Sequence, residues 1–271
     1  MTFKDYIQSH RSGDFSIAEV GYRELLRSYP DNYVVMHYLG LLLCQTGRVI
    51  EGKPLLDASI AKSPNRFEFL QNRGAVNFLE GKNEEAVIDL RNALSVNPSA
   101  IAVRVQLGEA LCRLGDIIGG LTEFQRTLTI SPSNENALRG AVHALKSLGK
   151  SSDGLAMLHA SEHSFNRSRE YQLLKSELLI DCGRFSEAEA VTDDILKRAP
   201  DNVEALLYSG IALAQLKRYS ESVDKFNRAL IHNPSHTGAL SNLAVVLHRQ
   251  GRFAAAAKAI EQAVALDRTN A

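Results

Sequence analysis

The chain has 271 residues, of which 45% are hydrophobic and 23% are charged, so it holds ample apolar material for a core. The chain has 31 lysine and arginine residues together and 31 aspartate and glutamate residues together. With no net charge, it has no overall electrostatic potential that would favour nucleic acid or a membrane surface as a partner. Membrane insertion is not expected either, because the longest apolar run, Tyr38 to Cys44, is too short to span a bilayer.

The N-terminal residues and the cysteines indicate where the protein works. The first fifteen residues include Lys4, Asp5 and Arg11 and lack the apolar core of a signal peptide. The three cysteines lie far apart and form neither a CxxC pair nor a disulfide framework. We therefore expect a cytoplasmic protein with reduced, packed thiols.

Four sets of residues recur along the chain at a spacing of 34. Prolines occur at Pro30, Pro64, Pro98, Pro132, Pro200 and Pro234. Glycines occur at Gly13, Gly47, Gly81, Gly115, Gly149, Gly183 and Gly251, and Lys217 takes the remaining place. Two further sets are small: Ala18, Gly52, Ala86, Gly120, Gly154, Ala188, Ser222 and Ala256, and Gly40, Gly74, Gly108, Ser176, Gly210 and Ala244. Such glycines suit left-handed turns, and the small residues predict two close helix contacts in every repeat.

Taken in order, the repeats differ in regularity. The first is shortened, and Tyr6 replaces its small residue. Asn32, Asn134 and Asn202 are predicted to cap helices that follow them. The fifth repeat is expected to be the least stable, because Asn166 replaces its proline, Val142 replaces its small residue and a polar run follows His159.

These residues resemble the tetratricopeptide repeat, a unit of 34 residues with Leu-Gly, Ala, Phe and Pro at set offsets. One copy reads Leu39-Gly40 and Pro64, and another reads Gly210, Phe226 and Pro234. The resemblance implies an all-α fold, a right-handed superhelical solenoid of antiparallel helix pairs forming a single array over residues 1–271. Its expected repeats are 3–32, 33–66, 67–100, 101–134, 135–168, 169–202, 203–236 and 237–270.

The resemblance also implies a function. In this family the first helix of each repeat lines a concave groove, so the expected function is that of a protein interaction scaffold, without cofactor or catalysis, which binds a peptide or protein segment. The groove candidates are Tyr38, Gln71, Asn72, Gln106, Glu109, Arg113, Arg139, His143, Lys146, Glu177, Tyr208, Asn242 and Arg249. Arg113, Arg139, His143 and Lys146 form a modest positive group that suits an acidic or C-terminal peptide.

Two alternatives to this function remain. The first two repeats look like the repeat arms of bacterial glycosyltransferases and sulfotransferases, which makes the substrate-recognition arm of a larger enzyme the main alternative. The string His159-Ala-Ser-Glu162-His163 matches a zinc-peptidase motif, but it keeps the phase of the repeat, and we expect a polar helix face there and no metal.

The family's clamp for chaperone C-terminal tails is not expected. His37, Leu41, Ala102 and Gln106 stand at the places around Asn72 where the clamp needs other residues. At the other end of the chain, the last helix pair is either polar enough on its own, or packs on a second copy of the chain in a homodimer, or packs on a further domain. Ala256, Ile260, Ala263 and Val264 are the residues that such a contact would use.

Overall fold

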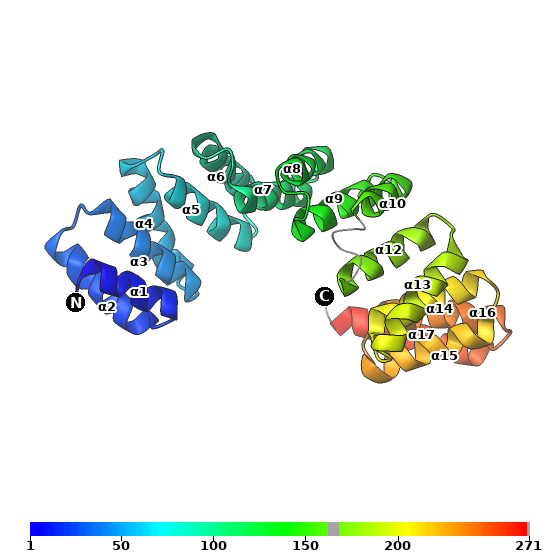
Figure 1. Ribbon diagram of the computed structural model, residues 1–271. Helices are drawn as coiled ribbons and strands as arrows, with labels where there is room; N and C mark the ends of the chain where they lie inside the picture. Colours follow the sequence, from blue (N-terminus) through cyan, green and yellow to red (C-terminus); the bar gives the residue numbers. More distant parts are fainter. Residues whose placement is uncertain (162–167, 270–271) are drawn as a thin grey trace. The chain divides into compact units, whose positions relative to one another are not determined.

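The computed structural model describes residues 1–161 and 168–269, and within these ranges every regular element is an α-helix (Figure 1). The chain divides into two compact units, Met1–Ala144 and Leu145–Ala271. The first unit contains α1 (Phe3–Ser12), α2 (Phe15–Ser28), α3 (Tyr33–Gln45), α4 (Val49–Lys62), α5 (Phe67–Leu79), α6 (Asn83–Val96), α7 (Ile101–Arg113) and α8 (Ile117–Ile130). The boundary between the units falls within α9 (Glu135–Ser147).

The second unit repeats the same pattern of paired helices. It contains α10 (Ser151–Ala160), α12 (Arg169–Asp181), α13 (Phe185–Arg198), α14 (Val203–Gln215), α15 (Tyr219–His232), α16 (Thr237–Arg249) and α17 (Phe253–Thr269). A first helix packs against the second helix that follows it in seven pairs: α1 with α2, α3 with α4, α5 with α6, α7 with α8, α12 with α13, α14 with α15, and α16 with α17. The described part of the chain is therefore an all-α helical repeat fold, as the sequence predicts.

The turn within each pair has the backbone that the glycine spacing predicts. The seven periodic glycines have φ between 71° and 88°, in the left-handed region. Lys217, which takes the eighth place, has φ 63° and is the one non-glycine residue with positive φ in the described ranges. The side chains of Asn32, Asn134 and Asn202 each accept a backbone N–H at a helix start, which confirms their predicted capping role.

The small residues mark close helix crossings. A methyl group added at Gly52 would lie 2.5 Å from the Gly40 carbonyl oxygen, so α3 and α4 cross with their backbones nearly in contact. The first repeat reverses this arrangement. Tyr6 takes the place of the small residue on α1, and Gly21 on α2 makes room for it, since a methyl group there would lie 2.3 Å from the Tyr6 ring.

Ionic contacts replace apolar ones at two crossings of the first unit. Arg73, at the place of the leucine in Leu-Gly, donates from Nε and Nη2 to Asp89 at 2.9 and 2.6 Å. Asp89 is only 2% exposed and also accepts from Asn77 at 3.0 Å. Arg104 likewise contacts the buried Glu123 at 2.7 Å. The periodicity alone does not predict these pairs, because an arginine at a core position looks like a departure from the pattern until its partner is known.

Candidate functional site

Five candidate residues of the first unit lie on α5 and α7 and form what we call the first-helix surface: Gln71, Asn72, Gln106, Glu109 and Arg113. The four residues before Arg113 are half-buried and Arg113 is exposed. They occupy successive turns of two neighbouring first helices, which the structure packs against each other. Polar groups from two repeats therefore line one surface.

Asn72 is held by a buried histidine. Its Nδ2 donates to His37 Nε2 at 2.9 Å, and the His37 ring stacks on Phe69 with centroids 3.9 Å apart. Burial, followed by the charge of Arg66, lowers the pKa of His37 to about 4, so the ring is neutral near neutral pH. The contact fixes the Asn72 amide and leaves its oxygen as an acceptor on the first-helix surface.

Arg113 is fixed by an aromatic ring. Its guanidinium lies over Phe78 at 3.8 Å from the ring centroid, and Nη1 donates to the Phe78 carbonyl at 3.2 Å. The flat guanidinium keeps other N–H groups for a ligand, because one contact uses only one of its five donors. Arg113 is thus a positioned cation at the edge of this surface.

Gln71, Gln106 and Glu109 differ from these two residues. In the part of the chain that the structure describes, their side chains have no hydrogen-bond partner or ion pair. A half-buried amide or carboxylate without a protein partner must be satisfied by water or by a ligand. These three side chains are therefore the ones on the surface with free hydrogen-bonding capacity.

Tyr38 belongs mainly to the core. Its ring lies 5.7 Å from that of Phe3 and 6.0 Å from that of Tyr22, within an aromatic group that joins α1, α2 and α3. His10 contributes to the same group and makes a 2.7 Å hydrogen bond to Gln45. The sequence could not reveal this role, since the first repeat departs from the pattern at Tyr6.

The second unit places its candidates in an ionic cluster. Lys146 pairs with Glu177 and lies 3.6 Å from Asp181. Burial alone lowers the pKa of Lys146, but these carboxylates outweigh it and leave the pKa above its usual value. Burial, then the charges of Glu177 and Glu204, raises the pKa of Tyr208 to about 12. Lys146 is therefore a neutralised charge here and not a free cation.

Two of the remaining candidates, Arg139 and Asn242, contact their own helices. Arg139 donates to Asn136 at 2.9 Å, and Asn242 donates to the Gly238 carbonyl at 2.8 Å. His143 is exposed and lies on α9 with Arg139. The contacts of Arg139 and Asn242 are therefore local to their own helices.

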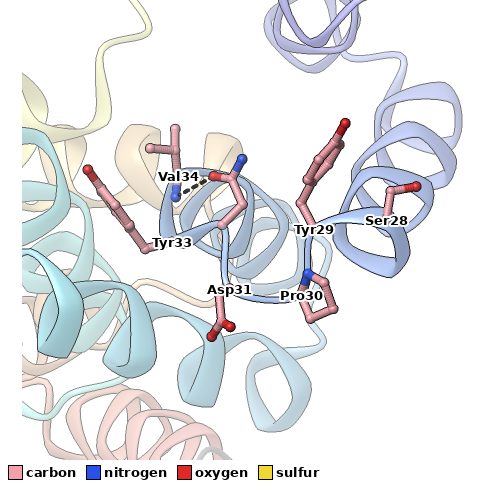
Figure 2. Close-up of a pocket in the computed structure, with 7 residues that line it drawn as sticks. Ser28, Tyr29, Pro30, Asp31, Tyr33 and Val34 are labelled. Carbon is pink, nitrogen blue, oxygen red and sulfur yellow. Dashed lines mark hydrogen bonds between the residues drawn. The ribbon is translucent and has the colours of Figure 1, made fainter.

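Two hollows were not predicted from the sequence. One, of about 590 Å³, is a shallow depression at the turn between α2 and α3, lined by Ser28, Tyr29, Pro30, Asp31, Asn32, Tyr33 and Val34. Figure 2 shows the rings of Tyr29 and Tyr33 on opposite sides of the turn and the Asp31 carboxylate pointing away from both. The other, of about 480 Å³, lies between α12 and α13 and is lined by Arg169, Gln172, Val191, Asp194, Ile195, Arg198 and Ala199. The 34-residue periodicity does not predict either hollow, because the shape of each depends on how neighbouring helices pack.

The described residues bear on the metal and membrane expectations as follows. Glu162 and His163 lie outside the described residues, so the motif that begins at His159 has no geometry to report. Within the described ranges, no group of three or more histidine, cysteine, aspartate or glutamate residues could hold a metal ion. No helix in those ranges is long and apolar enough to cross a membrane.

Helix pairs that recur every 34 residues and expose polar first-helix side chains define a helical-repeat protein. Comparison with known families and structures identifies which kind: a model described as "Tetratricopeptide repeat" matches residues 173–236 and 223–271. A solved tetratricopeptide repeat protein from Parabacteroides merdae superposes with a TM-score of 0.65 at 16% identity, over 90% of this chain and 96% of that one. Residues 173–271 therefore match the tetratricopeptide repeat, and the described chain has the fold of solved tetratricopeptide repeat proteins.

One curated relative and one further solved structure match about two thirds of the chain. The mouse protein "DnaJ homolog subfamily C member 7" is 24% identical over 195 residues, which are 67% of this chain and 39% of that protein. The solved structure titled "YrrB: a TPR protein with an unusual peptide-binding site" has a TM-score of 0.55 at 16% identity, over 68% of this chain and 95% of that one. The chain spans 31 to 39% of the length of curated relatives such as this mouse protein and human "Tetratricopeptide repeat protein 7B".

Proposed function

We propose that the protein is an interaction scaffold that binds an extended segment of another protein on the first-helix surface of the first unit. The observation that carries this proposal is the set of side chains without partners, Gln71, Gln106 and Glu109, beside the fixed Asn72 and Arg113. Tetratricopeptide repeat proteins in general mediate contacts between proteins, and the related YrrB structure is named for a peptide-binding site.

The chemistry of these side chains suits a peptide backbone. An extended segment offers an N–H and a C=O at each residue, and a glutamine amide can donate to one and accept from the other. Arg113 adds a charge-assisted hydrogen bond to a carboxylate or a carbonyl of the ligand. The proposal assigns no catalytic step and no cofactor.

The alternative of a recognition arm within a larger enzyme uses the same surface. It draws support from the greater length of the curated relatives, which extend well beyond the region that matches this chain. Both functions require that the array hold a segment of another protein, so the binding measurement comes first.

The test selects ligands from a phage-displayed library of random peptides and measures the binding of synthetic versions by fluorescence anisotropy. We expect Gln71→Ala/Gln106→Ala to weaken the selected peptides about tenfold, because two hydrogen bonds to the ligand are lost. Gln125→Ala, on the exposed side of the second helix α8, is the matched control and should bind as the wild type does. Equal binding by the double variant would place recognition elsewhere on the protein.

A further inference from the structure

Glu109 is the one member of the first-helix surface that carries a negative charge. Its side chain is half-buried, and within the described ranges it makes no ion pair and accepts no hydrogen bond. Partial burial removes some of the water that would solvate the charge, which raises the free energy of an unpaired carboxylate. A cation from outside the chain would therefore be stabilised by contact with this side chain.

Arg113 stands where it could pair with Glu109, but it is held elsewhere. It follows Glu109 by four residues on α7, and this is the spacing at which a glutamate and an arginine on one helix favour an ion pair. Its guanidinium instead lies over the Phe78 ring and donates to the Phe78 carbonyl at 3.2 Å. The cation of α7 is thus used in a contact with the preceding repeat, and the carboxylate is left without it.

The neighbouring helix α5 also leaves this carboxylate unpaired. The contact between α7 and α5 joins Arg113 to Phe78, a residue 35 positions earlier. The same register places Gly74 and Ala75 of α5 beside Glu109. Neither residue has a polar side chain, so α5 supplies no donor to the carboxylate at this level.

We propose that the segment bound on the first-helix surface presents a lysine or arginine side chain to Glu109, an inference that rests on the function proposed above. The ligand class is accordingly a basic segment of another protein. An ammonium or guanidinium group has only hydrogen-bond donors and a carboxylate has only acceptors, so the two form charge-assisted hydrogen bonds.

The fixed amide of Asn72 favours the same ligand. Its Nδ2 already donates to His37, so its oxygen is the group that remains for a ligand. By the 34-residue spacing Asn72 corresponds to Gln106, which lies one turn before Glu109 on α7. A basic side chain has donors for both oxygens, whereas an acidic side chain would place acceptors against acceptors. Arg113 is compatible with a basic segment, because its remaining N–H groups can donate to a backbone carbonyl.

Double-mutant cycles between the whole chain and its peptide ligands test this pairing. Peptides selected from the phage-displayed library are synthesised with each lysine replaced by norleucine or each arginine by citrulline, which keeps the aliphatic part of the side chain and removes its charge. We expect one such replacement to weaken binding to the wild type about tenfold and to leave binding to Glu109→Gln unchanged. Glu84→Gln, which removes an exposed carboxylate at the start of the second helix α6, is the control and should show the full tenfold effect.

The outcomes separate this inference from the proposed function. Peptides whose binding depends on Gln71 and Gln106 but on no basic residue would overturn the basic ligand and leave the proposed function in place. An equal effect of the replacement on Glu109→Gln and Glu84→Gln would also overturn it, because the basic side chain would then bind elsewhere. If the library yields no peptide that binds, both are wrong. Circular dichroism checks that each variant is folded.

Discussion

His37 determines how Asn72 is presented on the first-helix surface, and it does so as a buried neutral ring. The side chain is 1% exposed, accepts a hydrogen bond from Asn72 and stacks on Phe69. A protonated ring could not accept that bond, and burial would leave its charge poorly solvated. The position of Asn72 therefore depends on pH through its neighbour.

Stability should fall as the pH drops from about 6.5 toward about 4, because the pKa of His37 is lowered over that range in the folded protein. The unfolded chain binds a proton there that the folded chain does not, so the free energy of unfolding decreases with decreasing pH. The full loss would be at most about 3 kcal/mol. Urea unfolding of the wild type and of His37→Gln at pH 7 and pH 5 measures it.

The variant His37→Gln should lose most of this dependence between pH 7 and pH 5. His248→Gln, which alters an exposed histidine on α16, serves as the control and should keep the wild-type dependence. If His37→Gln and the wild type lose stability in parallel, another group accounts for the effect, and the role given to His37 is wrong.

The partners of the candidate residues were harder to predict than their positions. Asn72 and Arg113 follow from the repeat spacing, but His37 and Phe78 lie 35 residues before them, and Glu177 lies 31 residues after Lys146. These contacts join neighbouring repeats, so no local pattern reveals them. Pairs of complementary side chains about one repeat apart in the sequence are the signal from which these contacts could have been predicted.

At the scale of elements, turn residues decide where each helix ends. The glycine positions predict the left-handed turns, and the structure has them, because few other residues adopt positive φ without cost. Gly21 opposite Tyr6 was not predictable in this way. It compensates a departure from the repeat, and only the packed helices show which residue makes the room.

Lys217→Gly should stabilise the protein by about 1 kcal/mol, because lysine at φ 63° bears the strain that glycine avoids. Gly183→Lys makes the reverse change at the same turn position, where φ is 73°, and should destabilise by a similar amount. Urea unfolding midpoints measure both. An unchanged midpoint in both variants would show that these turns tolerate lysine and that the glycine period has another cause.

At the scale of the whole molecule, the 34-residue spacing predicts a helical repeat fold. It does not predict that the chain divides into two compact units. Eight similar repeats suggest one uniform array, whereas the structure groups its residues into Met1–Ala144 and Leu145–Ala271. In a repeat protein each repeat contacts only its neighbours, so a uniform spacing does not tell where the chain divides. Whether all the repeats act as a single array remains a prediction.

The fifth repeat should be the least stable part of the chain, and the length of its second helix gives the physical reason. Helix α10 has 10 residues, whereas α13 and α15 have 14 each. The shorter helix has fewer backbone hydrogen bonds to offset the free-energy cost of forming its first turn. In addition, Gly154 in its interior costs about 0.5 to 1 kcal/mol relative to alanine.

Hydrogen exchange followed by mass spectrometry tests this order of stability. Amides of α10 should exchange at least about tenfold faster than those of α15, because local opening of the shorter helix requires less free energy. Helix α13, which has the length of α15, is the internal control and should exchange at the α15 rate. Equal protection of 151–160 and 220–232 would mean that contacts with α12, such as the 2.9 Å hydrogen bond from Tyr171 to the Leu158 carbonyl, compensate for the short helix. The fifth repeat would then not be the place where this chain opens first.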